Sequence, residues 1–236
     1  MSRIQLDSDL LDYIINAGFQ PNDRLPTLNT LQDEAHLNIG ISKVREQLEV
    51  ARALGFVEIR SKTGMRLKPY NFKPAVRLSL FFALAQSARN FELFGEVRNH
   101  LEVAFWNEAV ARMLPEDFEQ MRTCITRATE KLDGAHIRIP NEEHRTFHLT
   151  QFKRLENPFV MGILESYWDA YEAVEVTRYA SYQYLQEVWK YHAQILDALE
   201  SGAIERAKGL FIEHTRLIRY DHDAAAEAKP SSNQGN

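Results

Sequence analysis

Apolar residues recur at helical spacing near the N-terminus, in two stripes separated by a break. The first stripe holds Leu28, Leu31 and Ala35, and the second, longer stripe begins at Val44. Residues 37–40 (Leu-Asn-Ile-Gly) interrupt the spacing between them. The pattern therefore predicts two helices that meet across a tight turn.

An alternating pattern of apolar and polar residues follows the second helix. Val57 and Ile59 alternate with Glu58 and Arg60, residues 61–64 are typical of a turn, and residues 65–67 return to the apolar pattern. This order predicts a β-hairpin. Three helices, two short and one longer, with a β-hairpin wing describe a winged helix-turn-helix over residues 1–69. In this fold the second helix of the helix-turn-helix lies in the major groove of DNA.

The chain beyond residue 75 keeps helical spacing almost throughout. Seven helices are predicted, over residues 75–88, 91–113, 116–133, 141–155, 158–176, 182–200 and 203–221. The fold class is thus mainly α, with an all-helical domain over residues 75–224. Residues 70–74 are expected to form a linker, and residues 225–236, which are small and polar, a disordered tail.

Composition supports two domains in one chain. At 236 residues and a net charge of −5, the protein is large enough for a small and a larger domain and too acidic to coat nucleic acid. A single cysteine, Cys124, excludes an internal disulfide framework, and the N-terminus lacks a secretory layout. The most apolar run is shorter than the roughly 20 residues that span a bilayer. We expect a cytoplasmic protein without a membrane segment.

Positive charge is concentrated in one part of the predicted winged helix-turn-helix, which we call the reader. Residues 1–42 carry two cations against six acids, whereas residues 43–68 carry seven cations against three acids. A local basic surface fits site-specific binding to double-stranded DNA, although a solvated face of an interaction domain would have the same pattern. The expected DNA contacts are Arg24, Thr27, Ser42, Lys43, Arg45, Lys62, Thr63 and Gly64.

Four histidines of the helical domain have spacings that suit a metal site. His144 and His148 are four residues apart, so both project from one face of a helix, and His192 and His214 lie on later helices among apolar neighbours. Three or four imidazoles on converging helices suit Zn²⁺ or Ni²⁺. The alternative is that each is an ordinary core or surface histidine satisfied by hydrogen bonds.

Arg98 and Glu102 are the candidates for binding an effector. They lie four residues apart, next to an apolar stripe of Val97, Leu101, Ala104 and Phe105. One interpretation is that they form a surface ion pair and have no other role. An arginine at the edge of a metal pocket would instead offer a bidentate site for a carboxylate. The dense aromatic residues between 167 and 191 predict mainly core and dimer packing, with Tyr167 and Tyr171 as candidates for lining the pocket.

Motifs for nucleotide hydrolysis or acyl transfer are missing from the sequence, which has no Gly-rich phosphate loop and no Gly-x-Ser-x-Gly elbow. We therefore expect no enzyme. The alternative is a metal-dependent enzyme tethered by the N-terminal module, with Glu142 or Glu143 as its base.

Over about residues 10–220 the chain resembles GntR-family transcriptional regulators of the FadR type, which carry a C-terminal ligand-sensing FCD domain. In the reader the resemblance rests on residues 23–26 (DRLP), 44–46 (VRE) and 54–58 (LGFVE). In the sensor it rests on residues 97–102 (VRNHLE), 144–148 (HRTFH), 156–158 (ENP), His192 and His214. The family usually has Ser-Arg at the start of the recognition helix, where this chain has Gly40-Ile41, so the remaining cations and the wing must supply more of the DNA contact.

The resemblance implies a metal site and an effector site. Metal-binding members use an Asp-x-x-x-His pair and two later histidines, and here His144 stands in the place of the aspartate. The fourth ligand is therefore His144, Glu143 or water. The resemblance also implies that Arg98 holds the carboxylate of an effector. The expected protein is a homodimeric regulator, a repressor of a palindromic operator, that responds to a small organic acid. A metal-independent regulator, in which the histidines only shape the pocket, is the alternative.

Overall fold

The computed structural model of the chain describes residues 4–33, 37, 39–62, 64–175, 177 and 180–217. Its contacts divide the chain into two compact units that meet between Ser79 and Leu80. Thr63 of the expected wing contacts and the predicted tail of residues 225–236 lie outside the described residues. Each unit has its own apolar core, as expected for two domains.

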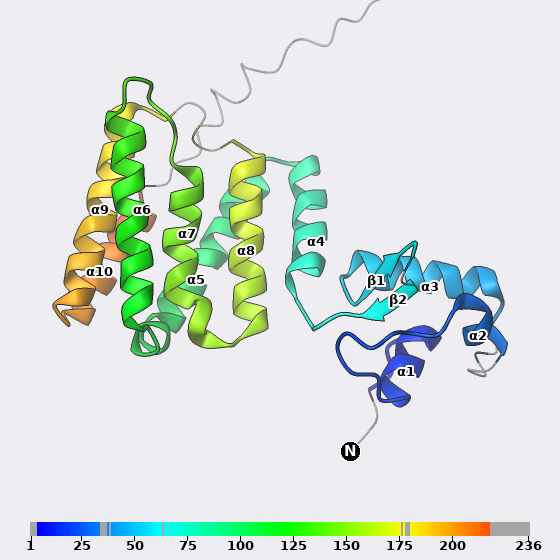
Figure 1. The fold of residues 1–236 in the computed structure, drawn as a ribbon. Helices are drawn as coiled ribbons and strands as arrows, with labels where there is room; N and C mark the ends of the chain where they lie inside the picture. The colour runs from blue at the N-terminus through cyan, green and yellow to red at the C-terminus, as the bar shows by residue number, and fades with distance from the viewer. Residues whose placement is uncertain are drawn as a thin grey trace, which may run out of the picture. The chain divides into compact units, whose positions relative to one another are not determined.

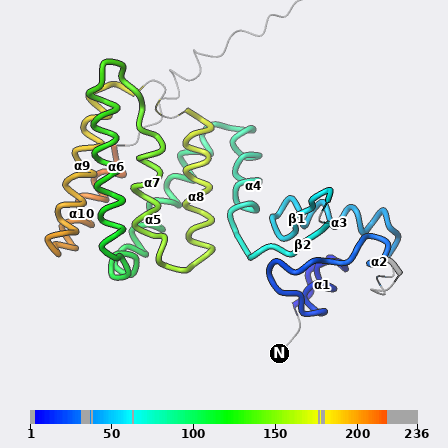
Figure 2. Tube along the Cα trace, in the orientation of Figure 1, coloured from blue at the N-terminus to red at the C-terminus, as the bar shows by residue number. Residues whose placement is uncertain are grey.

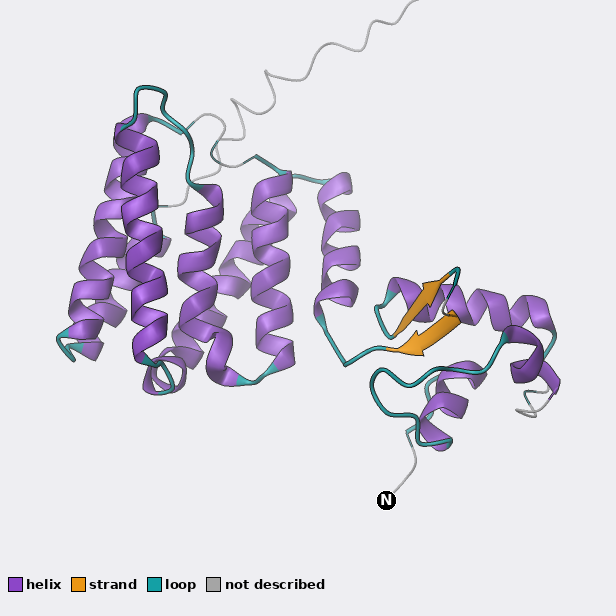
Figure 3. Ribbon diagram, in the orientation of Figure 1, coloured by secondary structure: helices purple, strands orange, loops and turns teal. Residues whose placement is uncertain are grey.

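The N-terminal unit is a winged helix-turn-helix (Figures 1 and 3). Its elements are α1 (Asp9–Asn16), α2 (Leu28–Asp33), α3 (Ile41–Ala53), β1 (Val57–Arg60) and β2 (Gly64–Leu67). The two strands are antiparallel, with Val57 opposite Leu67 and Ile59 opposite Met65. The predicted order of helices and hairpin is confirmed.

A buried glutamine ties two helices of this unit together. The Oε1 atom of Gln47 on α3 accepts a hydrogen bond of 2.9 Å from the backbone N–H of Leu10, and its Nε2 donates to Asp9 at 3.0 Å. Leu10 and Val44 lie in the apolar core beneath this link. The amide thus satisfies a backbone donor in the first turn of α1 that has no partner within the helix.

The second unit is all helical, and its helices run alongside one another with connections at alternating ends (Figure 2). Helix α4 (Lys73–Gln86) spans the boundary between the two units. The other helices of the second unit are α5 (Arg89–Ala111), α6 (Pro115–Asp133), α7 (Asn141–Phe152), α8 (Pro158–Ala173), α9 (Tyr182–Glu200) and α10 (Ile204–Thr215), with a short 3-10 helix, η1 (Lys153–Leu155), after α7. Helix α7 packs against α5, α6 and α8, and α10 packs against α5 and α9. Among the described residues, none of the helices combines the length and apolarity that a membrane span requires.

Local sequence explains several of the helix boundaries. Pro115 opens α6, and the Oδ1 atom of Asn157 accepts hydrogen bonds from the N–H groups of Phe159 and Val160 at the start of α8. Ser181 caps α9 in the same way. The predicted boundaries differ in detail: α4 begins at Lys73, within the range expected to be a linker, and α8 ends at Ala173, before the expected residue 176.

Candidate functional site

Four histidines converge from three helices of the second unit. His144 and His148 lie one turn apart on α7, His192 comes from α9 and His214 from α10. All four are buried, and one ring nitrogen of each lies within 4.8 Å of those of the others. The structure thus brings together the set of histidines that the sequence singled out, which we call the histidine cluster.

Three members of the histidine cluster have ring nitrogens at ligand-like distances. The Nε2 atom of His148 lies 3.1 Å from that of His214 and 3.3 Å from that of His192, and the last two are 3.0 Å apart. Ligand nitrogens about 2.1 Å from one ion, at angles between about 90° and 109°, are separated by about 3.0 to 3.4 Å. The triangle therefore has the dimensions of three imidazoles around one first-row metal ion.

His144 completes the cluster beside this triangle. Its ring centroid lies 4.9 Å from that of His192 and 5.0 Å from that of His148. The Nε2 atom of His144 is buried and has no hydrogen-bond partner in the described part of the chain. Because buried polar atoms almost always have a partner, this nitrogen could serve as a fourth ligand.

The neighbouring carboxylate of Glu143 is already paired. Its Oε1 atom lies 2.5 Å from the Nζ atom of Lys131 on α6. Of the two residues that the sequence left open, His144 is the one that lies among the other histidines.

Burial keeps the histidine cluster neutral. It lowers the pKa of His144, His148 and His192 well below the usual value and that of His214 to about 3, and the positive charge of Arg98 adds to the effect in each case. A neutral imidazole retains the lone pair that a metal requires. The protonation state therefore suits coordination.

Aromatic rings hold the imidazoles in place. The ring centroid of Phe147 lies 4.3 Å from that of His192, and Trp168 lies 4.7 Å from His144. Trp189 packs edge-on against His192 at 4.6 Å. Such packing limits rotation of the imidazole rings.

Arg98 and Glu102 form a fully buried ion pair beside the histidine cluster. The Nε atom of Arg98 lies 2.6 Å from Oε2 of Glu102, and both side chains are 0% exposed. A surface ion pair, one of the two alternatives from the sequence, is therefore wrong. The expected apolar stripe of α5 is also partly wrong, because Val97 is 51% exposed while the charged pair faces inward.

Arg98 links the ion pair to the cluster. Its Nη2 atom lies 2.9 Å from Nδ1 of His148, and its guanidinium carbon lies 4.9 Å from the centre of the Tyr167 ring. Burial raises the pKa of Glu102 to about 7, even though Arg98 partly opposes that shift. Tyr171 is also buried, with its ring 5.6 Å from that of His144. All four residues proposed for the effector thus adjoin the cluster or each other.

Several buried polar atoms around this site have no hydrogen-bond partner among the described residues. They are the Oε1 atom of Glu102, the indole nitrogens of Trp106 and Trp168, Nε2 of His144, and Nδ1 of His192 and His214. A native interior rarely leaves so many donors and acceptors unsatisfied in one region. Their concentration marks a place where a polar ligand or water could bind.

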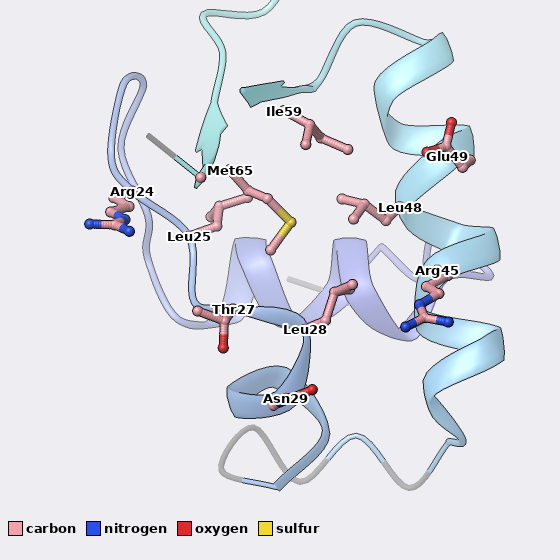
Figure 4. Close-up of a pocket in the computed structure, with 11 residues that line it drawn as sticks. Arg24, Leu25, Thr27, Leu28, Asn29, Arg45, Leu48, Glu49, Ile59 and Met65 are labelled. Carbon is pink, nitrogen blue, oxygen red and sulfur yellow. The ribbon is translucent and has the colours of Figure 1, made fainter. Parts of the chain in front are cut away.

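The winged helix-turn-helix carries a cleft of about 770 Å³ between α2, α3 and the hairpin (Figure 4). Arg24 and Arg45 lie on opposite sides of it, and Thr27 and Gly64 also line it. Leu25, Leu28, Leu48 and Met65 form its apolar floor. Four of the residues proposed for DNA contact therefore share one surface.

The other proposed DNA contacts lie outside this lining. Ser42 and Lys43 are exposed on the first turn of α3, where Lys43 pairs with Glu46 at 3.1 Å. Lys62 is exposed in the turn between the strands. The role of these residues in DNA binding stays a prediction.

Comparison with known proteins gives the family. The FCD domain family matches residues 94–217, more than half of the chain. The chain belongs to the FCD domain family. A winged helix-turn-helix followed by an FCD domain is the organisation of GntR-family transcriptional regulators of the FadR type, and it confirms the resemblance found in the sequence.

Two relatives illustrate the similarity. The HTH-type transcriptional regulator LutR of Bacillus subtilis (strain 168) is 22% identical over 207 residues, which cover 85% of this chain and 92% of LutR. The solved structure of Streptococcus agalactiae GntR superposes with a TM-score of 0.59 at 16% identity, covering 89% of this chain and 94% of that one. The similarity to the solved structure supports the fold described above.

Sequence reasoning missed Trp106 and Trp168 in the FCD domain. Trp106 is fully buried and lies four residues after Glu102, as Glu102 lies four after Arg98, so helical spacing from the charged pair could have found it. Trp168 directly follows Tyr167 and lies in the dense aromatic segment, which predicted mainly core and dimer packing. Both indoles belong to the buried surroundings of the site.

Proposed function

We propose that this FCD regulator represses transcription as a homodimer, and that a small organic acid bound in a metal-containing pocket changes its affinity for a palindromic operator. The observation that carries the proposal is the buried histidine cluster beside Arg98. It combines neutral metal donors with a fixed positive charge, and this combination suits an anionic ligand.

His148, His192 and His214 would hold a divalent ion such as Zn²⁺ or Ni²⁺, with His144 as a fourth ligand. The nitrogen donor set and the 3.0 to 3.3 Å spacing of the three Nε2 atoms fit such an ion. When bound, the ion would supply positive charge that attracts an anion. Four neutral imidazoles add no negative charge, so that attraction would be stronger than in a site with an aspartate ligand.

Arg98 would bind the carboxylate of the effector, with Glu102 orienting the guanidinium and Tyr167 and Tyr171 enclosing it. The guanidinium presents paired donors that match a carboxylate. The indole N–H of Trp168, which has no hydrogen-bond partner among the described residues, is a further donor in the same region. An organic acid is favoured over a neutral ligand because Arg98 is buried and carries a permanent charge.

In a homodimer, two readers would contact half-sites about 34 Å apart on one face of the DNA. The effector would act by binding one arrangement of the readers more tightly than the other. Such coupling typically amounts to about 1–3 kcal/mol.

Elemental analysis of the purified protein tests the metal site. The wild type is expected to hold close to stoichiometric metal, whereas His148→Ala and His192→Ala should lose most of it. His100→Ala is the matched control, because His100 is exposed and its Nδ1 atom lies 2.7 Å from the backbone carbonyl of Glu96 on its own helix. Equal metal content in all four proteins would defeat the metal site and favour a metal-independent regulator.

A further inference from the structure

The contact between Arg98 and His148 determines where the imidazole carries its proton. A guanidinium has only donors, so the 2.9 Å contact is a hydrogen bond from Nη2 of Arg98 to the lone pair of Nδ1 of His148. A nitrogen that accepts a hydrogen bond carries no proton. His148 in this structure is therefore a neutral imidazole with its proton on Nε2.

This tautomer is unsuited to metal coordination. Nε2 is the atom through which His148 joins the triangle, at 3.1 Å from His214 and 3.3 Å from His192. A ligand nitrogen must offer its lone pair to the ion. Coordination through Nε2 thus requires the proton to appear on Nδ1 instead, with no change in the number of protons bound, and Arg98 has no acceptor for it.

Glu102 is placed to accept that proton in a hydrogen bond. Its Oε1 atom lies 3.9 Å from Nδ1 of His148, and neither of its oxygens has a hydrogen-bond partner in the described part of the chain, although Oε2 is ion-paired with Arg98. A carboxylate is the usual acceptor for the free N–H of a metal-bound histidine. Arg98 can therefore donate a hydrogen bond to Nδ1 of His148 in one tautomer, and Glu102 can accept one from the same atom in the other tautomer.

We propose that Arg98 and Glu102 act in opposition on His148: Arg98 holds the tautomer that cannot coordinate, and Glu102 accepts the Nδ1 proton of the tautomer that can. The inference rests on the proposed metal site and adds its regulation. A carboxylate that draws the guanidinium away from His148 frees Nδ1, so effector and metal favour each other's binding. By linkage the coupling is equal in both directions.

Nitrogen-15 NMR of the histidine rings tests the tautomers directly, with the full chain, first stripped of metal by a chelator and then loaded with Zn²⁺. We expect His148 to carry its proton on Nε2 in the metal-free protein and on Nδ1 in the zinc-loaded protein. His148→Gln identifies the signal. A metal-free His148 already protonated on Nδ1 overturns the inference.

Zinc affinity, measured by competition with a chromophoric chelator, gives a second readout. Glu102→Gln removes the acceptor and should weaken Zn²⁺ binding by about 10- to 100-fold. Arg98→Met removes the competing donor and a neighbouring positive charge, and should tighten Zn²⁺ binding by about tenfold. If the two residues served only to stabilise the fold, both single variants would weaken binding, and that result overturns the inference.

The double variant Arg98→Met/Glu102→Gln guards against misfolding, because it removes both charges and leaves no unpaired buried ion. Its affinity should lie between those of the two single variants. If wild-type protein binds no Zn²⁺, or binds it equally after His148→Ala, the proposed metal site fails as well. Histidine-dependent binding without opposite effects at Arg98 and Glu102 defeats the present inference alone.

Discussion

The carboxylate of Glu143 lies 2.5 Å from the ammonium of Lys131, whereas the next residue, His144, lies in the histidine cluster. Glu143 is also one of the two residues, with Glu142, that the enzyme alternative named as a base beside a metal. The ion pair joins α6 to α7, and it leaves the carboxylate of Glu143 occupied by Lys131.

Glu143→Gln should leave the metal content unchanged and lower the melting temperature, because the variant removes a largely buried ion pair and leaves Lys131 without its partner. His144→Ala should instead weaken zinc binding. Elemental analysis and thermal unfolding distinguish the two. Loss of metal from Glu143→Gln comparable to that from His148→Ala would show that Glu143 is a ligand.

Stability of the metal-free protein should fall as the pH is lowered through about 6.5. The unfolded chain takes up protons on its histidines near that pH, whereas burial lowers the pKa of the four native histidines, to about 3 for His214. The native state therefore binds fewer protons, and each group removes up to about 1.4 kcal/mol per pH unit below 6.5.

Urea unfolding in chelator between about pH 7.5 and 5.5 measures this loss. The slope should be shallower for His192→Gln, which removes one buried imidazole, and unchanged for His100→Ala. Constant stability over this range would contradict burial of the cluster in its neutral form.

Arg45→Ala should weaken operator binding by about 1–3 kcal/mol if Arg45 reads a base edge. The residue is exposed on α3 and lines the cleft of the reader (Figure 4). Arg52→Ala is the control, because Arg52 is exposed in the last turn of the same helix and is paired with Glu49. Fluorescence anisotropy over a range of salt concentrations makes the comparison, and equal affinities of Arg45→Ala and wild type would remove Arg45 from the contact set.

Gly55→Ala should lower the free energy of unfolding by about 2 kcal/mol or more. Gly55 has a φ of +77°, and an added Cβ would lie 2.6 Å from Cγ of Pro74. Gly18→Ala distinguishes the effect of the positive φ from that of the contact with Pro74, because Gly18 has a φ of +76° with nothing within 4 Å of its Cβ position. This variant should cost only about 1 kcal/mol. Similar losses in both variants would show that Pro74 moves aside at no cost.

The sequence could predict the elements because their signals are local. Asn157 and Ser181 cap helices through atoms within three residues, and the hairpin follows from alternation over a few positions. The four histidines could likewise be selected from their spacing on individual helices.

The burial of Arg98 and Glu102 could not be predicted in the same way. Periodicity assigns apolar residues to the interior, so it placed Val97 inside and the ion pair outside. The inward position of the pair depends on partners from other helices, His148 and Tyr167, which are about 50 and 70 positions later in the chain. The same holds for the distances between histidines, since packing of α7, α9 and α10 sets them.

The position of His214 on α10 has a consequence for the order of events during synthesis. The buried residues of the reader's apolar core lie between residues 10 and 65. The histidine cluster includes His214 of α10, so it can form only after the last described helix has left the ribosome. Domains fold as units while the chain is made. A nascent chain can therefore fold its winged helix-turn-helix well before the proposed ligand site is complete, and chains that end before α10 would lack His214 of that site.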